Sequence, residues 1–76
     1  LDDHHIAVDS PLACSIWQVL VEPGMAVKAG DTLLILEAMK MEIKLEAPCD
    51  GVVLSLQRQA GAQVAAGERL LVLEVQ

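Results

Sequence analysis

The side chains that could do chemistry in this 76-residue chain are few and scattered. The sequence has no nucleophile and base at a plausible spacing, no paired carboxylates at a plausible site and no phosphate-binding loop, so it does not predict an enzyme. One segment stands apart, Ala38-Met39-Lys40-Met41, in which the lysine lies between two methionines. A lysine amine is mostly protonated at neutral pH and attacks an acyl group only after losing that proton. Lys40 is therefore a candidate for modification by another protein.

The sequence contains no residue pattern typical of a metal site or of a disulfide framework. His4 and His5 are adjacent and lack further histidine or cysteine ligands at zinc-site spacing, so we interpret them as part of a solvated tail. Cys14 and Cys49 could form at most one disulfide, and we interpret both as free, buried thiols. The sequence thus predicts no metal site.

The composition limits the partners and the size of the protein. Eleven acidic and five basic residues give a net charge of −6, which disfavours nucleic acids and anionic membranes as partners. No apolar run approaches the roughly 20 residues that span a bilayer, and the first residues do not form a leader, which predicts a cytosolic protein. We expect one small domain over residues 9–76, a flexible N-terminal tail over 1–8, and an origin in a longer protein.

An internal repeat organises the chain. Displacing the sequence by 37 positions superimposes prolines, glycines and core aliphatic residues without a gap. The matched pairs are Pro11 with Pro48, Gly24 with Gly61, Val27 with Val64, Gly30 with Gly67, Leu33 with Leu70, Leu36 with Leu73 and Glu37 with Glu74. Two copies are too few for a solenoid, so the repeat predicts a closed domain of two similar halves related by an approximate two-fold axis.

Short apolar runs separated by turn residues fill both halves. The expected strands are 16–21, 26–28, 32–37, 52–56 and 70–75, with glycine-containing turns between them. Strands and turns at such close intervals predict an all-β sandwich or barrel.

The segment 36–46, which joins the halves, is ambiguous by composition because its residues are good helix formers. Apolar and charged residues alternate strictly over 39–46, however, which is the period of a half-buried strand. We therefore predict two strands with a reversal near Lys40. That reversal lacks the glycine, asparagine or aspartate of a tight hairpin, so non-glycine residues must adopt unusual backbone angles there. The repeat places the chain ends at the opposite pole.

The segment Ala38-Met39-Lys40-Met41, flanked by Glu37 and Glu42, resembles the Ala-Met-Lys-Met signature of biotinyl carrier domains in biotin-dependent carboxylases. The similarity covers nearly everything from residue 10 to 75 and includes the segments 10–13, 21–24, 27–31, 47–48 and 50–51. It implies an all-β, flattened barrel-sandwich hybrid of two four-stranded antiparallel sheets with internal pseudo-two-fold symmetry. The lysine is then expected at the tip of a tight hairpin.

The resemblance also implies a function. Lys40 would carry covalent biotin, attached as an amide by a separate biotin protein ligase. A biotin carboxylase would load a carboxyl group onto the ring using ATP and bicarbonate, and a carboxyltransferase would unload it, while the domain itself catalyses nothing. Met39 and Met41 would help ligase recognition and carboxyl transfer, although methionines on any exposed hairpin would look the same. Ala38 completes the expected cofactor-binding set.

Four charged residues around the tip have simpler interpretations. Glu37 and Glu42 fit solvated strand charges as well as they fit ligase contacts. Lys28 and Lys44 are interpreted as surface charges.

Two departures qualify the resemblance. Cys14 stands where the family, and its own repeat partner Gly51, have glycine, so either the backbone there needs no positive φ or the cysteine is strained. The first strand also runs straight into the Pro23-Gly24 turn, without the protruding loop of bacterial acetyl-CoA carboxylase carriers. The segments 15–21 and 35–38 are most similar to urea carboxylase (urea amidolyase), with acyl-CoA and pyruvate carboxylases as alternatives.

Two other functions compete with this hypothesis. A lipoyl carrier domain shares the fold and the hairpin lysine, but its lysine usually follows aspartate and precedes alanine, instead of the methionines found here. A purely structural barrel-sandwich module would need no lysine at the tip. The methionine frame around Lys40 counts against both.

Overall fold

The computed structural model describes residues 4–75, and these residues form eight β-strands and no helix. In chain order the strands are β1 (His5–Asp9), β2 (Cys14–Val19), β3 (Ala26–Val27), β4 (Thr32–Ala38), β5 (Met41–Glu46), β6 (Gly51–Leu56), β7 (Gln63–Val64) and β8 (Arg69–Val75). The segment 36–46 is therefore two strands and a turn, as its alternation predicts. Within 4–75 there is accordingly no helix with the length and apolar character to cross a membrane.

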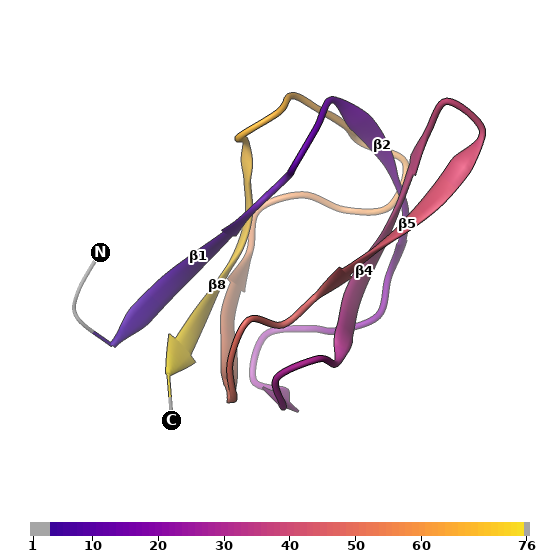
Figure 1. The fold of residues 1–76 in the computed structure, drawn as a ribbon. Helices are drawn as coiled ribbons and strands as arrows, with labels where there is room; N and C mark the ends of the chain where they lie inside the picture. Colours follow the sequence, from indigo (N-terminus) through magenta and orange to yellow (C-terminus); the bar gives the residue numbers. More distant parts are fainter. Residues whose placement is uncertain (1–3, 76) are drawn as a thin grey trace.

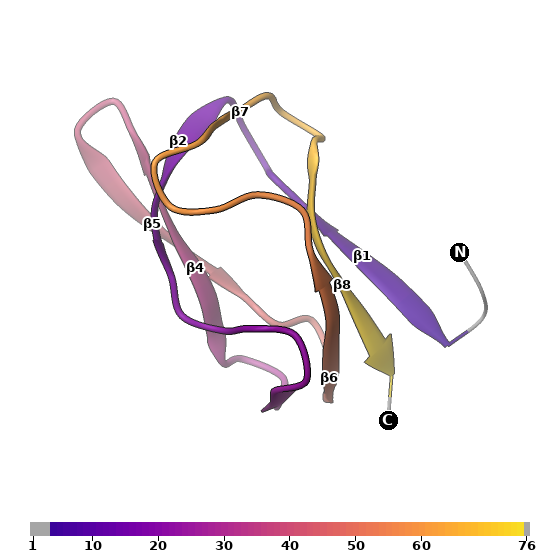
Figure 2. The same cartoon turned by 180° about the vertical axis from the view of Figure 1, so that it is seen from behind.

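The strands form two four-stranded sheets that face each other (Figures 1 and 2). One sheet has the order β1-β8-β6-β3 and the other β5-β4-β2-β7, and every pairing is antiparallel. Consecutive strands lie mostly in different sheets, so the chain crosses repeatedly between the layers. This architecture confirms the expected all-β sandwich of two four-stranded antiparallel sheets.

The repeat of 37 residues is a repeat of structure. Adding 37 to the bounds of β2, β3 and β4 gives the bounds of β6, β7 and β8, and the same shift converts one sheet order into the other. Gly24 and Gly61 have φ of 95° and 91°, which an L side chain rarely adopts, and each donates a backbone hydrogen bond to the opposite half. The acceptors are Val53 and Ile16, at 2.7 and 2.8 Å. The pseudo-two-fold symmetry is thereby confirmed.

The core lies between the sheets and is aliphatic. Burying one leucine-sized side chain stabilises a fold by about 1.5–3 kcal/mol, so a few such residues hold a domain of this size. The largest fully buried side chains are Ile16, Leu33, Leu34, Leu36, Val53, Leu70, Leu71 and Leu73. Trp17, the sole aromatic residue, lies outside this core and is 48% exposed.

Each half carries a β-bulge at the same repeat position. Trp17 is the extra residue in β2 where it pairs with β4, and Leu54 is the extra residue in β6 where it pairs with β8. A bulge sets two residues of one strand against one of its neighbour and breaks the in-out alternation. Trp17 and the next residue, Gln18, are therefore both exposed, and Gln18 pairs with Ile35 of β4.

The N-terminal boundary differs from the expectation. The flexible tail expected over 1–8 is wrong for residues 5–8, which belong to β1 and pair with β8, and residues 1–3 lie outside the described part. The repeat itself explains the error, because subtracting 37 from residues 42–46 of β5 gives 5–9. The backbone N–H of Val75 donates to the His4 carbonyl at 2.7 Å. The beginning of β1 and the end of β8 thus lie together, at the end opposite the β4–β5 hairpin (Figure 1).

Candidate functional site

The β4–β5 hairpin reverses through two residues that both have positive φ. Ala38 pairs with Met41, and between them Met39 has φ of 52° and Lys40 has φ of 65°. Positive φ at both central residues is the signature of a type I′ turn, whose twist matches that of the flanking strands. Most hairpins place asparagine or glycine in these positions, because an L side chain in left-handed backbone costs roughly 1–2 kcal/mol. The unusual backbone angles expected at the reversal are therefore confirmed.

The register of the two strands fixes where this turn falls. Leu36 of β4 opposes Ile43 of β5, and both side chains face the core. A slip by one residue would turn the apolar side chains of a strand towards solvent, so the pairing must continue unchanged to Ala38 and Met41. The turn consequently falls on the two residues between them, although their types do not favour it.

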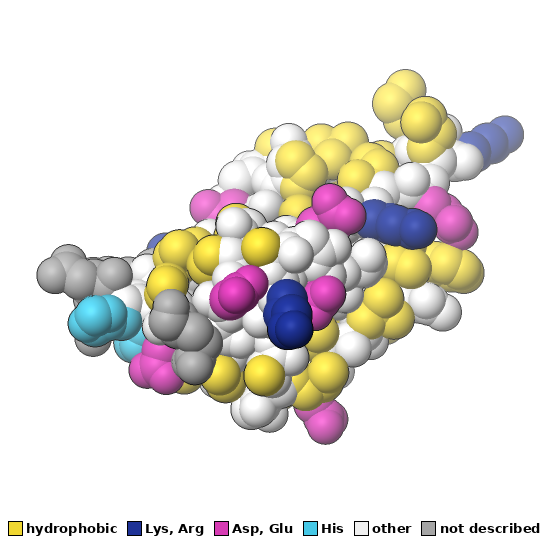
Figure 3. Space-filling view, turned by 60° about the horizontal axis from the view of Figure 1, so that its bottom comes forward, with side chains coloured by type: hydrophobic (Ala, Val, Ile, Leu, Met, Phe, Trp, Pro, Cys, Tyr) yellow, Lys and Arg dark blue, Asp and Glu magenta, His cyan; other side chains and the backbone are white. Residues whose placement is uncertain are grey.

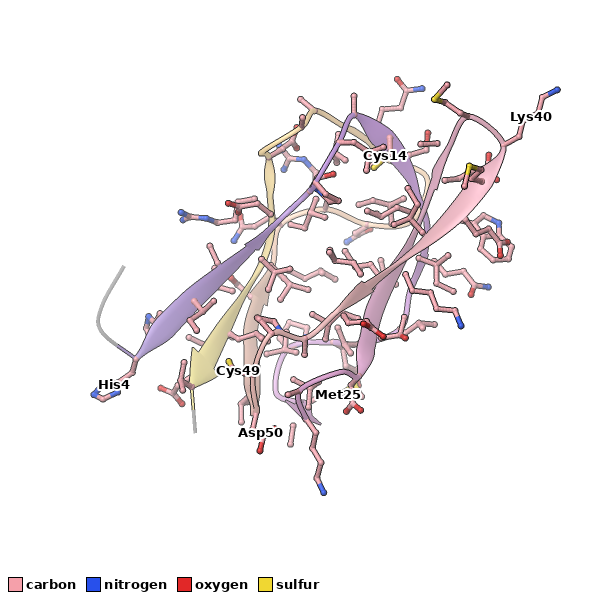
Figure 4. The ribbon with its side chains drawn as sticks, in the orientation of Figure 1. His4, Cys14, Met25, Lys40, Cys49 and Asp50 are labelled. Carbon is pink, nitrogen blue, oxygen red and sulfur yellow. The ribbon has the colours of Figure 1, made fainter. Side chains whose placement is uncertain are left out.

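The tip of the hairpin projects into solvent. Met39 is 91% exposed and Met41 is 65% exposed, and the Lys40 side chain is exposed as well. Figure 4 shows Lys40 pointing away from the body of the domain, and Figure 3 shows apolar side chains beside a basic one at this projecting end. Among residues 4–75, the Lys40 amine makes no hydrogen bond or ion pair. The amine is thus sterically free to receive a substituent.

Two carboxylates stand directly below the tip. Glu37 of β4 pairs with Glu42 of β5, one row before the turn, and both side chains are exposed on the outer face of the sheet. Neither forms an ion pair within the described residues. The sequence shows Glu37 and Glu42 as two separate acidic residues. Only the register of β4 and β5 shows that they lie opposite each other.

The other two lysines lie in different surroundings. Lys44 is on the outer face of β5 opposite Ile35, and Lys28 follows β3 in a turn where its backbone N–H donates to the Asp31 carboxylate at 2.9 Å. Both side chains are exposed, as expected for surface charges. Neither has the positive φ of Lys40, so a single lysine occupies the projecting turn.

The cysteines and Gly51 show where the halves diverge. Cys14 and Cys49 are free, as expected, but they are half-buried instead of buried. A Cβ at Gly51 would overlap the Glu74 carbonyl oxygen, because β8 continues alongside it. At the matched position, Cys14 has no partner on β4, whose pairing with β2 ends one residue earlier. Cys14 has no positive φ, so the first of the two alternatives for Cys14 holds and its side chain is accommodated.

The chain resembles known proteins over almost its whole length. Residues 6–73 match the family model described as biotin-requiring enzyme. Pyruvate carboxylase of Staphylococcus aureus is 41% identical over 70 residues, which cover 92% of this chain and 6% of that protein. The chain therefore spans only a small part of such relatives.

Solved structures agree with the sequence match. A single-chain, multi-domain long-chain acyl-CoA carboxylase superimposes with a TM-score of 0.92 and 33% identity, covering all of this chain and 8% of that one. Urea carboxylase of Kluyveromyces lactis superimposes with a TM-score of 0.87 and 30% identity, covering 96% of this chain and 6% of that one. The chain belongs to the family of biotin-requiring enzymes. Within that family it is a biotin carboxyl carrier domain, a non-catalytic module for covalently bound biotin.

The lipoyl alternative shares the fold. The lipoyl domain of the 2-oxoglutarate dehydrogenase complex from Azotobacter vinelandii superimposes with a TM-score of 0.78 and 26% identity, covering 90% of this chain and 94% of that one. This agreement follows from the common sandwich and hairpin. The fold alone therefore does not distinguish a biotinyl domain from a lipoyl domain.

Proposed function

We propose that Lys40 is the residue that carries biotin, and that the domain moves carboxyl groups between a biotin carboxylase site and a carboxyltransferase site of a larger carboxylase. One observation carries the proposal: Lys40 alone among the three lysines occupies a solvent-projecting turn held in left-handed backbone. When attached, biotin supplies a ureido nitrogen that can accept a carboxyl group and release it. The chain itself must present the amine to a ligase and carry the attached group to both active sites.

The hairpin presents the amine to a ligase. The rigid β4–β5 ladder holds the turn away from the sheets, so an enzyme can approach Lys40 from several sides. Met39 and Met41 offer apolar surface on both sides of the amine, and exposed methionines adapt well to a binding partner. Ala38 is small and keeps the first position of the turn clear. We propose that these three residues form the recognition frame for a biotin protein ligase.

The same geometry suits delivery to two active sites. A substituted Lys40 lies at one end of the domain, and β1 begins and β8 ends at the other, so chain connections at that end would not obstruct the cofactor. Tethering raises the effective concentration of the reacting group at each site. We infer a carboxylase of the urea type, with the acyl-CoA and pyruvate types as alternatives, and the likeness to all three supports this choice. We also propose that the domain works in the cytosol, whose reducing environment suits its two free thiols.

Intact mass after co-expression with a biotin protein ligase tests the proposal. We expect the wild-type chain to gain the mass of one biotinyl group and the Lys40→Arg variant to gain none. Lys44→Arg is the matched control, because it removes a lysine from the same strand pair and should still gain biotin. A wild-type chain that stays unmodified, or a Lys40→Arg chain that gains biotin, contradicts the proposal. A lipoyl mass increment after exposure to a lipoate ligase would instead favour the alternative.

A further inference from the structure

The outer face of the sheet that carries Lys40 has an exposed aromatic platform. It consists of Trp17 and Gln18, which are neighbours at the bulge in β2, and Ile35 of β4, which pairs with Gln18. Trp17 is 48% exposed, Gln18 is exposed and Ile35 is half-buried. None of the three belongs to the core between the sheets. We call these three residues the Trp17 platform.

The repeat provides an internal comparison for this platform. The matched residues on the other sheet are Leu54, Ser55 and Val72, which have the same bulge and the same register. The backbone arrangement therefore needs neither an aromatic ring nor a carboxamide at these positions. Val72 is only 7% exposed, whereas Ile35 is more open. The two outer faces differ in the residues that could hold a flat, polar-edged ligand, and that difference occurs on the sheet with the lysine.

The platform lies within reach of a substituent on Lys40. Ile35 opposes Lys44 of β5, which follows Lys40 by four residues, so the row of Ile35 lies about 13 Å from Lys40 along the strand. The lysine side chain and the acyl chain of biotin together have about eleven bonds and extend about 13 Å at the bond spacing of an extended chain. The bicyclic ring, which begins where this tether ends, can therefore return to the outer face at the row of Ile35, four strand positions from Lys40.

The chemistry of the platform matches that ring. The fused bicycle has an apolar thioether side that can stack on an indole, and a ureido edge with N–H donors and a carbonyl acceptor. The Gln18 carboxamide can accept from such an N–H and donate to such a carbonyl. Three side chains are also a small area compared with the roughly 800 Å² that each partner buries in a stable protein interface. The platform fits a ring better than a protein domain.

From these observations we propose that the Trp17 platform is a resting site for the biotinyl group on Lys40. This inference rests on the proposed function. No pocket exists among residues 4–75, so the contact is open and weak. A tethered ring nevertheless experiences an effective concentration in the millimolar range, which gives partial occupancy even for a weak site. The ring leaves the platform when an active site binds it more tightly.

Tryptophan fluorescence provides the test, because Trp17 is the only tryptophan in the chain. The unmodified and biotinylated chains, with modification verified by mass, are compared by acrylamide quenching and by the NMR shift of the indole N–H. Partial occupancy predicts that biotinylation lowers the quenching constant by roughly a third to a half. The Lys40→Gln variant, which loses the same charge without gaining a ring, is expected to behave as the unmodified chain.

The repeat also supplies a matched control. In the double variant Trp17→Leu with Leu54→Trp, the reporter moves to the bulge of the other sheet, and biotinylation should leave its quenching unchanged. If a verified biotinylated chain shows the same Trp17 quenching and indole shift as the unmodified chain, the resting site is wrong while the proposed function stands. An equal response of both reporters would also overturn it. A chain that gains no biotin fails earlier, in the mass measurement, so the two failures are distinguishable.

Discussion

Glu37 and Glu42 face each other across the β4–β5 ladder, one row below the turn that presents Lys40. Like charges directly opposite each other in a sheet oppose its formation. Glu74, the repeat partner of Glu37, has a different neighbour, because its carboxylate lies 3.8 Å from the imidazole of His5. The acidic pair is therefore not a demand of the fold.

Removing one of these charges is expected to stabilise the domain. Glu37→Gln should raise the free energy of unfolding by about 0.2–1 kcal/mol at low salt, because it relieves cross-strand repulsion. The gain should shrink in high salt, which screens exposed charges. Urea unfolding at two salt concentrations measures both effects. Glu74→Gln is the control and should give no gain, and an equal gain there would refute the explanation.

The left-handed backbone at the turn is expected to lower the stability of the domain. Met39→Asn should raise the free energy of unfolding by about 1 kcal/mol, because asparagine accepts the left-handed backbone of a type I′ turn more readily. The same substitution at Met41, which has no positive φ, should not stabilise. Thermal unfolding of both variants provides the comparison. No gain at Met39 would mean that the turn is not strained in solution.

Gly51 and Cys14 occupy matched positions of the repeat, but substitution by alanine is expected to destabilise the domain much more at Gly51. Gly51→Ala should destabilise the domain by about 2–3 kcal/mol, since the new Cβ overlaps the Glu74 carbonyl oxygen. Cys14→Ala should cost far less, because Cys14 already carries a Cβ. Urea midpoints of the two variants test this difference. Equal losses would show that β8 can move away from Gly51.

Glu68 predicts a pH dependence of stability. A hydrogen bond from the Ala65 backbone N–H to the Glu68 carboxylate, and then the Arg58 side chain, hold the pKa of Glu68 below its usual value. A carboxylate whose pKa is lower in the folded state stabilises the fold above its unfolded pKa, and this contribution is lost as the pH falls through the folded value. The difference in unfolding midpoint between wild type and Glu68→Gln should therefore diminish in acid.

A second variant separates the two causes at Glu68. Arg58→Gln keeps the hydrogen bond from Ala65, so most of the pH dependence should remain. If Arg58→Gln abolishes the dependence completely, the backbone hydrogen bond is not the main cause.

The sequence predicted this fold well because its information is periodic. The repeat and the alternation over 39–46 placed β4 and β5, and the missing turn residues indicated the positive φ of Met39 and Lys40. Bulges could not be predicted this way, since an extra residue such as Trp17 shows only when the partner strand is known. The opposition of Glu37 and Glu42 was missed for the same reason, because cross-strand pairs depend on register.

The hydrogen bond between Val75 and His4 has a mechanical consequence. Because of this hydrogen bond, the beginning of β1 and the end of β8 lie at a single place on the domain. The hairpin tip and the place where β1 begins and β8 ends lie at opposite ends of the molecule (Figure 1), whose longest dimension is 35 Å. A rotation of the whole domain about that place would therefore move Lys40 farther than it moves any residue near the chain ends.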